Sequence, residues 1–371
     1  MLLFLTKKKE HSIQVNNMKK IIFLFATMLL AVPVLHAEEG DGFDPGSMII
    51  GHVTDAHSWH MFDYVKDGQE HAVAIPLPVI VWNDGHLDIF SSARFHHGHA
   101  AYKGYALVGG GAEKEEIVCV DEAGNPTGVK PLDLSITKTA AAIMIAVALL
   151  IVIVFVARAG YKKRPDQAPK GLQSLVEMLV VFVRDSIARP MIGEGKYQRY
   201  LPYLLTLFFF IFFCNILGLI PFFPAGANIT VNIAVTATLA VITFLITNIS
   251  GNRHYWTDIF NTPGVPAWLK VFPLMPVVEL VGVFTKPIVL MIRLFANMTA
   301  GHIVILGFIV IIFILSNLFG MAVGGAVSVV SVFFSVFISL LECLVAYIQA
   351  FVFTMLTALY IGMAVTEPHH E

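Results

Sequence analysis

Charged residues are scarce in this sequence, which argues against an ordinary soluble protein. Of its 371 residues, 13% are charged and 57% are hydrophobic, whereas a typical soluble domain carries roughly a quarter charged residues. The net charge is -2, and Lys and Arg do not gather into a basic face of the kind that nucleic acid requires. The composition therefore indicates a protein embedded in lipid and argues against a nucleic-acid partner.

Two kinds of site are also missing from the sequence. No G-x-x-x-x-G-K-[ST] loop is present, so nothing predicts nucleotide binding by this chain. The three cysteines do not suggest a disulfide framework, because Cys214 and Cys343 fall in apolar runs and only Cys119 lies in a polar region. We therefore expect no catalytic residue and no cofactor on this chain.

The first forty residues have the pattern of a targeting segment. A basic stretch ending at Lys20 precedes an apolar run over residues 21–34. This pattern predicts a secretory signal peptide over residues 1–37, with Met18 as an alternative start. An uncleaved membrane anchor is the alternative, although the apolar run is short for a full span.

Residues 38–136 have the composition of a soluble segment. An Asn-Asp-Gly turn signal at 83–85 separates an apolar stretch at 72–82 from another at 86–90, which is typical of strands joined by a tight turn. We expect a small β-rich domain here. The signal peptide would place this domain outside the cytoplasmic membrane.

This predicted domain is rich in histidine. No pair of its histidines has the spacing of a metal-ligand motif, so we expect solvated histidines and no metal site. A metal-handling protein with a membrane anchor is the alternative. The histidines lie at positions 52, 57, 60, 71, 86, 96, 97 and 99.

Five apolar regions follow within residues 137–367, and the first three are each near the ~20 residues that a transmembrane helix requires. Each of the last two would extend ~60 Å as a helix, about twice the ~30 Å hydrocarbon thickness. We expect these two to form a strongly tilted helical hairpin with its turn at 316–325. The sequence thus predicts an all-α polytopic membrane protein with five transmembrane helices. The expected spans cover about 139–157, 200–220, 228–249, 273–315 and 326–365.

The connection between the first two spans is basic, whereas residues 221–227 and the hairpin turn contain no Lys or Arg. The positive-inside rule places this connection in the cytoplasm. An exported N-terminus followed by five crossings likewise leaves the tail at 368–371 cytoplasmic. Apolar residues at helical spacing between Leu172 and Ile187 predict an amphipathic helix on the cytoplasmic surface. The basic residues of the connection are Arg158, Lys162, Lys163, Arg164, Lys170, Arg184, Arg189, Lys196 and Arg199.

Polar side chains inside the two long apolar regions are the candidate functional residues, because ionised groups are costly at bilayer depth. Glu279, Lys286 and Arg293 recur every seven residues, which returns to nearly the same face of a helix. His302 is nine residues beyond Arg293 and hence on the opposite face. A proton path needs titratable groups of this kind at different depths. The first region holds Glu279, Lys286, Arg293, Asn297 and His302, and the second holds Glu342 and Gln349.

Structural roles are the alternative for most of these residues. Lys286 could pair with Glu279 near the headgroups, and the amide side chains could simply hydrogen-bond between helices. For His302 and Glu342 we favour function, because both titrate at membrane depth. Arg293 is the strongest functional candidate, because its neighbours on both sides are apolar.

The run Arg293-Leu-Phe-Ala-Asn297-Met-Thr-Ala-Gly301-His302 carries a resemblance to a known family. It resembles the signature helix of subunit a of the bacterial F-type ATP synthase, whose core is Arg-Leu-Phe-(Gly/Ala)-Asn-Met followed by Ala-Gly. Further matching segments are 214–221, 228–232 and 349–357. The resemblance covers about residues 137–367, and the N-terminal domain is not part of the common family pattern.

The sequence departs from the family at one pair of positions. Many bacterial members have Glu after the Ala-Gly and His seven residues before the Gln of the last helix. Here the order is His302 and Glu342, so the two side chains are exchanged. The exchanged pair still places one imidazole and one carboxylate together.

The resemblance implies a proton-conducting stator subunit of the bacterial inner membrane. Its partners would be the ring of c subunits, the b subunits of the peripheral stalk and the rest of the synthase. The guanidinium would attract a deprotonated ring carboxylate and separate two aqueous half-channels, with Glu279 on the exit side. The proton-translocating residues implied are Arg293, His302, Glu342, Asn297, Gln349 and Glu279, with Lys286 and Asn215 in support.

An ion-coupled secondary transporter is the alternative function. Such a protein could also use intramembrane Arg, Glu and His. The inverted repeats expected of many transporters are absent from the sequence, which favours the synthase.

Overall fold

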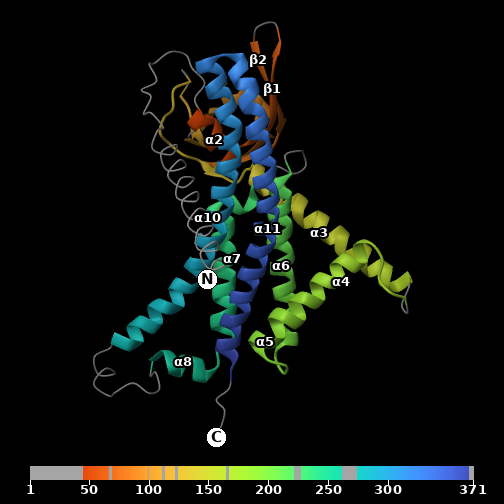
Figure 1. Ribbon diagram of the computed structural model, residues 1–371. Helices are drawn as coiled ribbons and strands as arrows, with labels where there is room; N and C mark the ends of the chain where they lie inside the picture. The colour runs from red at the N-terminus through yellow and green to blue at the C-terminus, as the bar shows by residue number, and fades with distance from the viewer. Residues whose placement is uncertain are drawn as a thin grey trace, which may run out of the picture. The chain divides into compact units, whose positions relative to one another are not determined.

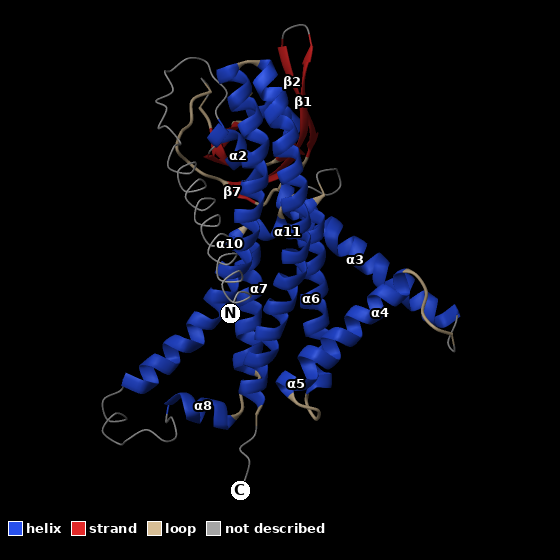
Figure 2. Ribbon diagram, viewed as in Figure 1, coloured by secondary structure: helices blue, strands red, loops and turns tan. Residues whose placement is uncertain are grey.

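The computed structural model describes residues 45–66, 69–98, 100–110, 113–121, 124–163, 167–220, 227–260 and 274–366. The predicted signal peptide at 1–37 and the tail at 368–371 lie outside the described residues. Within these described residues, a β-rich segment comes first and is followed by long helices (Figures 1 and 2).

The β-rich segment begins with the short helix α2 (Pro45–Val53) and confirms the expected small β domain. Its strands form three small antiparallel sheets, which are β1–β2, β4–β3–β7 and β5–β6. The strands are β1 (Ser58–Lys66), β2 (Gln69–Pro76), β3 (Pro78–Asn83), β4 (His86–Ser91), β5 (Tyr105–Gly110), β6 (Glu113–Cys119) and β7 (Leu132–Asp133), and a 3₁₀ helix η1 (Ser92–Gly98) follows β4.

The turn signal lies where the sequence predicts it, between β3 and β4. Asp84 and Gly85 have φ angles of 47° and 84°, and two successive positive φ values are what a two-residue type I′ hairpin turn requires. Val79 and Val81 of β3 and Phe95 of η1 are fully buried and form the centre of the domain's own core.

Among the described residues, four helices are long and apolar enough to cross a membrane, and one bent pair of helices would make a fifth span if it crosses as a unit. This agrees with the predicted polytopic, mostly helical fold. The helices are α3 (Lys138–Lys163), α4 (Leu172–Phe182), α5 (Arg189–Ile192), α6 (Tyr197–Leu219), α7 (Ile233–Ile249), α8 (Arg253–Phe260), α10 (Leu274–Phe319) and α11 (Met321–Val365), with a π-helical segment η2 (Val183–Ala188) and a 3₁₀ turn η3 (Ile229–Val231).

Helix α7 is shorter than the predicted span at 228–249. The chain forms the 3₁₀ turn η3 first, and the side chain of Asn232 then accepts a hydrogen bond from the backbone N–H of Ala234, 3.0 Å away. This N-cap starts the helix at Ile233. Beyond Ile249 the chain bends by 101° into α8.

The two longest helices form the expected hairpin, but its turn is much shorter than predicted. Helix α10 continues to Phe319 and α11 begins at Met321, so the ten-residue turn expected at 316–325 is wrong. Gly320 alone reverses the chain with a φ of 88°, a conformation that glycine adopts without a Cβ penalty. The small, uncharged residues around it continue the helices.

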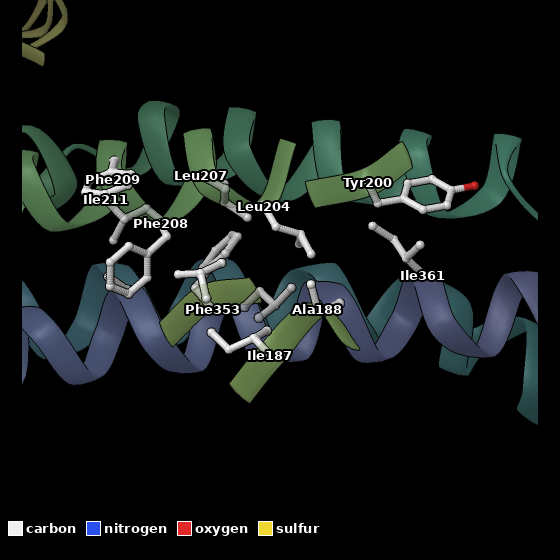
Figure 3. Packing of buried hydrophobic residues seen from close by; sticks show 14 of the residues in the cluster. Ile187, Ala188, Tyr200, Leu204, Leu207, Phe208, Phe209, Ile211, Phe353 and Ile361 are labelled. Carbon is white, nitrogen blue, oxygen red and sulfur yellow. The ribbon is translucent and has the colours of Figure 1, made fainter. Parts of the chain in front are cut away.

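The predicted amphipathic helix between Leu172 and Ile187 runs through α4 and η2. Val183 and Ile187 of its apolar face are fully buried against α6 and α11, whereas Leu172 and Leu175 at its start are exposed. Figure 3 shows Ile187 beside Phe353 of α11 in this cluster. The connection is thus held to the helix bundle by apolar packing.

The β domain packs directly on the helices. Trp59 and Leu77 of the domain share one buried cluster with Ala142 and Ala146 of α3 and Cys214 of α6. Small alanines on α3 let the two parts approach closely. The domain is therefore joined to one end of the bundle by side-chain packing in addition to the chain connection.

Candidate functional site

Arg293 lies on an exposed face of α10. The flanking Val289 and Ile292 are also exposed, at 47% and 51%, so the guanidinium stands on an apolar surface. Gln349 of α11 is only 3% exposed, and its Nε2 donates a hydrogen bond to the backbone carbonyl oxygen of Arg293, 3.3 Å away. The structure thus brings together Arg293 and Gln349, which lie 56 residues apart.

His302 lies on a different face of α10 and is buried, at 9% exposure. A Cβ atom at Gly218 of α6 would be 3.8 Å from His302 Nε2 and 2.9 Å from Asn228 Oδ1, so the imidazole and the amide approach the same point of α6. Both atoms are buried without a hydrogen-bond partner within the described part of the chain. Asn228 belongs to a segment that the sequence matched to the family, but its place beside His302 was not predicted.

Glu342 of α11 is buried against α10 with an exposed fraction of 6%. A Cβ atom at Gly301 would collide with its carboxylate, so Glu342 reaches α10 beside His302. Neither carboxylate oxygen has a hydrogen-bond donor among the residues described. The imidazole of His302 thus approaches Gly218 of α6, while the Glu342 carboxylate approaches Gly301, the residue before His302. No hydrogen bond between these two side chains is present in the described residues.

The two asparagines have different surroundings. Asn297 is exposed on α10, one turn after Arg293. Asn215 of α6 is fully buried, and its Oδ1 accepts a hydrogen bond from Thr230 Oγ1, 2.8 Å away. Asn215 thus fixes η3, which lies between Asn228 and the start of α7, to α6.

Glu279 and Lys286 lie nearer the start of α10 and are half-buried. The ammonium of Lys286 lies 5.5 Å from the centre of the Tyr360 ring of α11, within the range of a cation–π contact. No ion pair between Glu279 and Lys286 is present in the residues that the structure describes. Glu279, Lys286 and Arg293 therefore lie on α10 at the seven-residue spacing seen in the sequence, but each has different neighbours.

A second group of titratable residues lies in the β domain, and the sequence did not reveal it. His57 is buried, with Nε2 2.8 Å from Asp133 Oδ2 and Nδ1 3.5 Å from Glu115 Oε2. Burial disfavours the charged imidazole, but the two carboxylates outweigh it and raise the pKa of His57 to about 9. Burial likewise opposes ionisation of Asp133, yet the bonds from His57 and Ser135 lower its pKa to about 2.

These values describe a charged pair that persists at neutral pH, so the expectation of solvated histidines is wrong for His57. His86 and His96 are exposed as expected. No cluster of three or more His, Cys, Asp or Glu side chains suited to a metal ion occurs within the described ranges.

Comparison with known proteins decides the family. Residues 141–362 match the family model described as ATP synthase A chain. The chain belongs to the ATP synthase subunit a family. Within this family, the chain is 45% identical over 244 residues to ATP synthase subunit a of Chloroherpeton thalassium, covering 64% of this chain and 69% of the relative. It is 48% identical over 242 residues to ATP synthase subunit a 2 of Chlorobaculum tepidum (64% and 65%) and 45% identical over 244 residues to the subunit a of Myxococcus xanthus (65% and 76%).

Subunit a is the proton-conducting stator subunit of the F-type ATP synthase, and the present chain is a multi-pass, non-catalytic membrane subunit. Family membership decides against the secondary transporter. Residues 48–134 match a separate model, a domain of unknown function (DUF8433). The β domain is therefore an additional module ahead of the subunit a region.

Proposed function

We propose that Arg293 is the stator charge that faces the ring of c subunits. The observation that carries the proposal is its exposed position on an apolar face of α10, beside Val289 and Ile292. A cation at bilayer depth is costly unless a partner or water compensates it. A ring whose subunits each carry a lipid-embedded carboxylate would supply that compensation.

A guanidinium suits this task because it stays charged at any physiological pH. At low dielectric it attracts an ionised carboxylate strongly, and the attraction disappears when the carboxylate takes up a proton. Each ring carboxylate would therefore be held while ionised and released when protonated. A fixed positive charge would also keep protons from crossing directly between the two half-channels.

His302 and Glu342 are proposed to line the entry half-channel, together with Asn297 and Gln349. The assignment of His302 and Glu342 is supported by the burial of His302 Nε2 and of both Glu342 carboxylate oxygens, which have no hydrogen-bond partner in the described chain. Glu342 also contacts Gly301, the residue before His302. Groups held in this way can exchange protons with water that enters beside them. Gln349, through its bond to the Arg293 carbonyl, would hold the helix pair in register next to the guanidinium.

Glu279 is proposed to lie on the exit route. Lys286 and Asn215 are proposed as supporting residues of the proton path as a whole. The basic residues Lys162 and Lys163 at the end of α3 support a cytoplasmic position for that end. The β domain, which precedes the opposite end of α3, would then face outside, and the C-terminus would be cytoplasmic. The b subunits of the peripheral stalk and the remaining synthase subunits complete the proposed partners.

Replacement of Arg293 by Ala tests the proposal. Inverted membrane vesicles carrying the variant complex should lose ATP-driven acidification, while the c ring still co-purifies with the chain. The matched control is Arg158→Ala, which removes an exposed Arg near the basic end of α3 and should leave acidification unchanged. Normal pumping by an assembled Arg293→Ala complex would refute the assignment.

A further inference from the structure

The β domain holds a polar cavity of about 300 Å³ that reaches the residue just before α3. Its wall includes Asp55, His57, Glu115 and Asp133 of the domain and Thr137 just before α3. The ion pairs that His57 forms with Asp133 and Glu115 fix one side of this wall. A cavity lined by this many polar groups admits water.

Asp55 stands at the inner edge of this cavity and joins three parts of the molecule. Its Oδ1 accepts a hydrogen bond from the backbone N–H of Thr139, 3.0 Å away, in the first turn of α3. Its Oδ2 accepts one from Nδ2 of Asn232, 3.3 Å away, and Asn232 is the N-cap of α7. The backbone N–H of Ala56 also donates to Oδ1, 3.1 Å away, so the donors to this carboxylate come from the β domain, the first turn of α3 and the N-cap of α7.

Polar groups continue from Asp55 toward the candidate entry residues. Asn232 follows directly after η3, and Asn228 directly precedes it. The Asn228 amide and the His302 imidazole both lie close to Gly218 of α6. The Glu342 carboxylate contacts Gly301, the residue before His302. Asp55, Asn232, Asn228 and His302 therefore follow one another from the cavity into the helix bundle.

We propose that this cavity is the outer vestibule of the proton entry route and that Asp55 takes up protons at its inner edge. The proposal rests on the proposed function, in which the β domain faces outside. In the step, hydronium gives its proton to the Asp55 carboxylate and leaves as water. Protonated Asp55 then gives the proton to a water molecule on the way to His302, and this second transfer restores the Asp55 carboxylate. The β domain thus acquires a role, as the outer wall of the proton path.

If the cavity is the vestibule, the rate of proton conduction should depend on the sign of a charge placed in it. Ser135 lines the cavity, and Ser91 is an exposed serine of β4 away from its wall. Ser135→Cys and Ser91→Cys would each be made in a chain with Cys119→Ala and Cys343→Ala. Spheroplasts would be treated with membrane-impermeant methanethiosulfonates of similar size carrying either a trimethylammonium or a sulfonate group.

Passive proton conduction is then measured in inverted vesicles stripped of the catalytic sector, with a K⁺ diffusion potential drawing protons from the lumen. At Ser135→Cys the cationic adduct should slow conduction severalfold relative to the anionic adduct, because it repels hydronium, and reduction of the adduct should restore the rate. At Ser91→Cys the two adducts should conduct equally.

Equal rates for the two adducts at Ser135→Cys, with labelling verified by mass, would overturn the vestibule. If the unlabelled Ser135→Cys complex fails to conduct, Glu116→Cys on the same wall replaces it, and the same sign dependence is required. An experiment that overturns the vestibule would not affect the role of Arg293, which the Arg293→Ala variant tests separately. Normal pumping by Arg293→Ala would instead remove the proposed function itself.

Discussion

Gln349 ties the two long helices together at Arg293. Its Nε2 donates to the Arg293 backbone carbonyl oxygen over 3.3 Å, and the amide is almost completely buried. The side chain of Arg293 remains exposed on the other side of the helix. The residue that would carry the stator charge is therefore held through its backbone, which leaves the guanidinium free to meet a moving partner.

Gln349→Leu removes this bond while keeping a side chain of similar size. We expect a cost of about 1 kcal/mol and a partial loss of ATP-driven acidification, because α10 and α11 can then shift beside the guanidinium. The control is Ser339→Ala on the same helix, whose hydroxyl donates a hydrogen bond to the backbone carbonyl oxygen of Ser335, within its own helix. Full pumping by Gln349→Leu would show that the bond does not position Arg293.

Gly301→Ala should impair proton conduction, because the new Cβ would collide with the Glu342 carboxylate. The carboxylate has to move away from its position beside His302. Gly307→Ala is the matched control on α10, since a Cβ there meets no atom within 4 Å. Passive proton conduction through stripped vesicles measures the effect, and equal rates for the two variants would contradict the assigned position of Glu342.

The helical period predicted some of these relationships and missed others. It placed Arg293 and His302 on opposite faces, and the structure has the first exposed and the second buried. It did not place Glu342 against Gly301, because the register of two packed helices depends on where the hairpin turns. The turn itself is Gly320 alone, and a run of small apolar residues looks the same whether it forms a loop or continues a helix.

In the β domain, too, the sequence predicted local structure but not the contacts between distant residues. The Asn-Asp-Gly signal identified the turn at Asp84 and Gly85, because turn chemistry is local. The ion pair of His57 with Asp133 joins residues 76 positions apart, and neither residue has a neighbour in sequence that indicates a partner. A buried charged pair of this kind arises from tertiary packing, which composition does not report.

This ion pair should make the stability of the β domain dependent on pH. The pKa of His57 is raised from 6.5 to about 9, so its stabilisation is complete below pH 6.5 and is lost as the pH rises through 9. The pKa of Asp133 is lowered from 3.8 to about 2, so its contribution is lost only as the pH falls through 2. The pair is therefore strongest between about pH 4 and 6.5, and the His57 contribution is on the order of 3 kcal/mol.

Hydrogen exchange of the backbone amide of Ser135, which donates to Asp133, checks this pH dependence in the intact complex. After correction for the intrinsic pH dependence of exchange, protection should fall between pH 6.5 and 9. His57→Gln should remove that fall, while His86→Gln, at an exposed position, should retain it. Protection that stays constant to pH 9 in the unmodified chain would exclude a charged His57.

Thr230→Val should destabilise the junction between α6 and η3. The Thr230 hydroxyl donates to Asn215 Oδ1 over 2.8 Å, and both residues are buried. Valine has nearly the same shape, so the variant chiefly leaves the asparagine oxygen without its donor, at a cost of about 1–3 kcal/mol. The temperature at which the chain dissociates from the purified complex should fall.

Two further variants separate the hydrogen bond from other effects of the substitution. Thr238→Val, at an exposed threonine of α7 whose hydroxyl bonds Ala234 O, should leave the dissociation temperature nearly unchanged. Combining Thr230→Val with Asn215→Leu removes both buried partners, so the double variant should lose less stability than the two single losses added together. Strictly additive losses would mean that the two side chains stabilise the junction independently, and that the bond between them contributes nothing of its own.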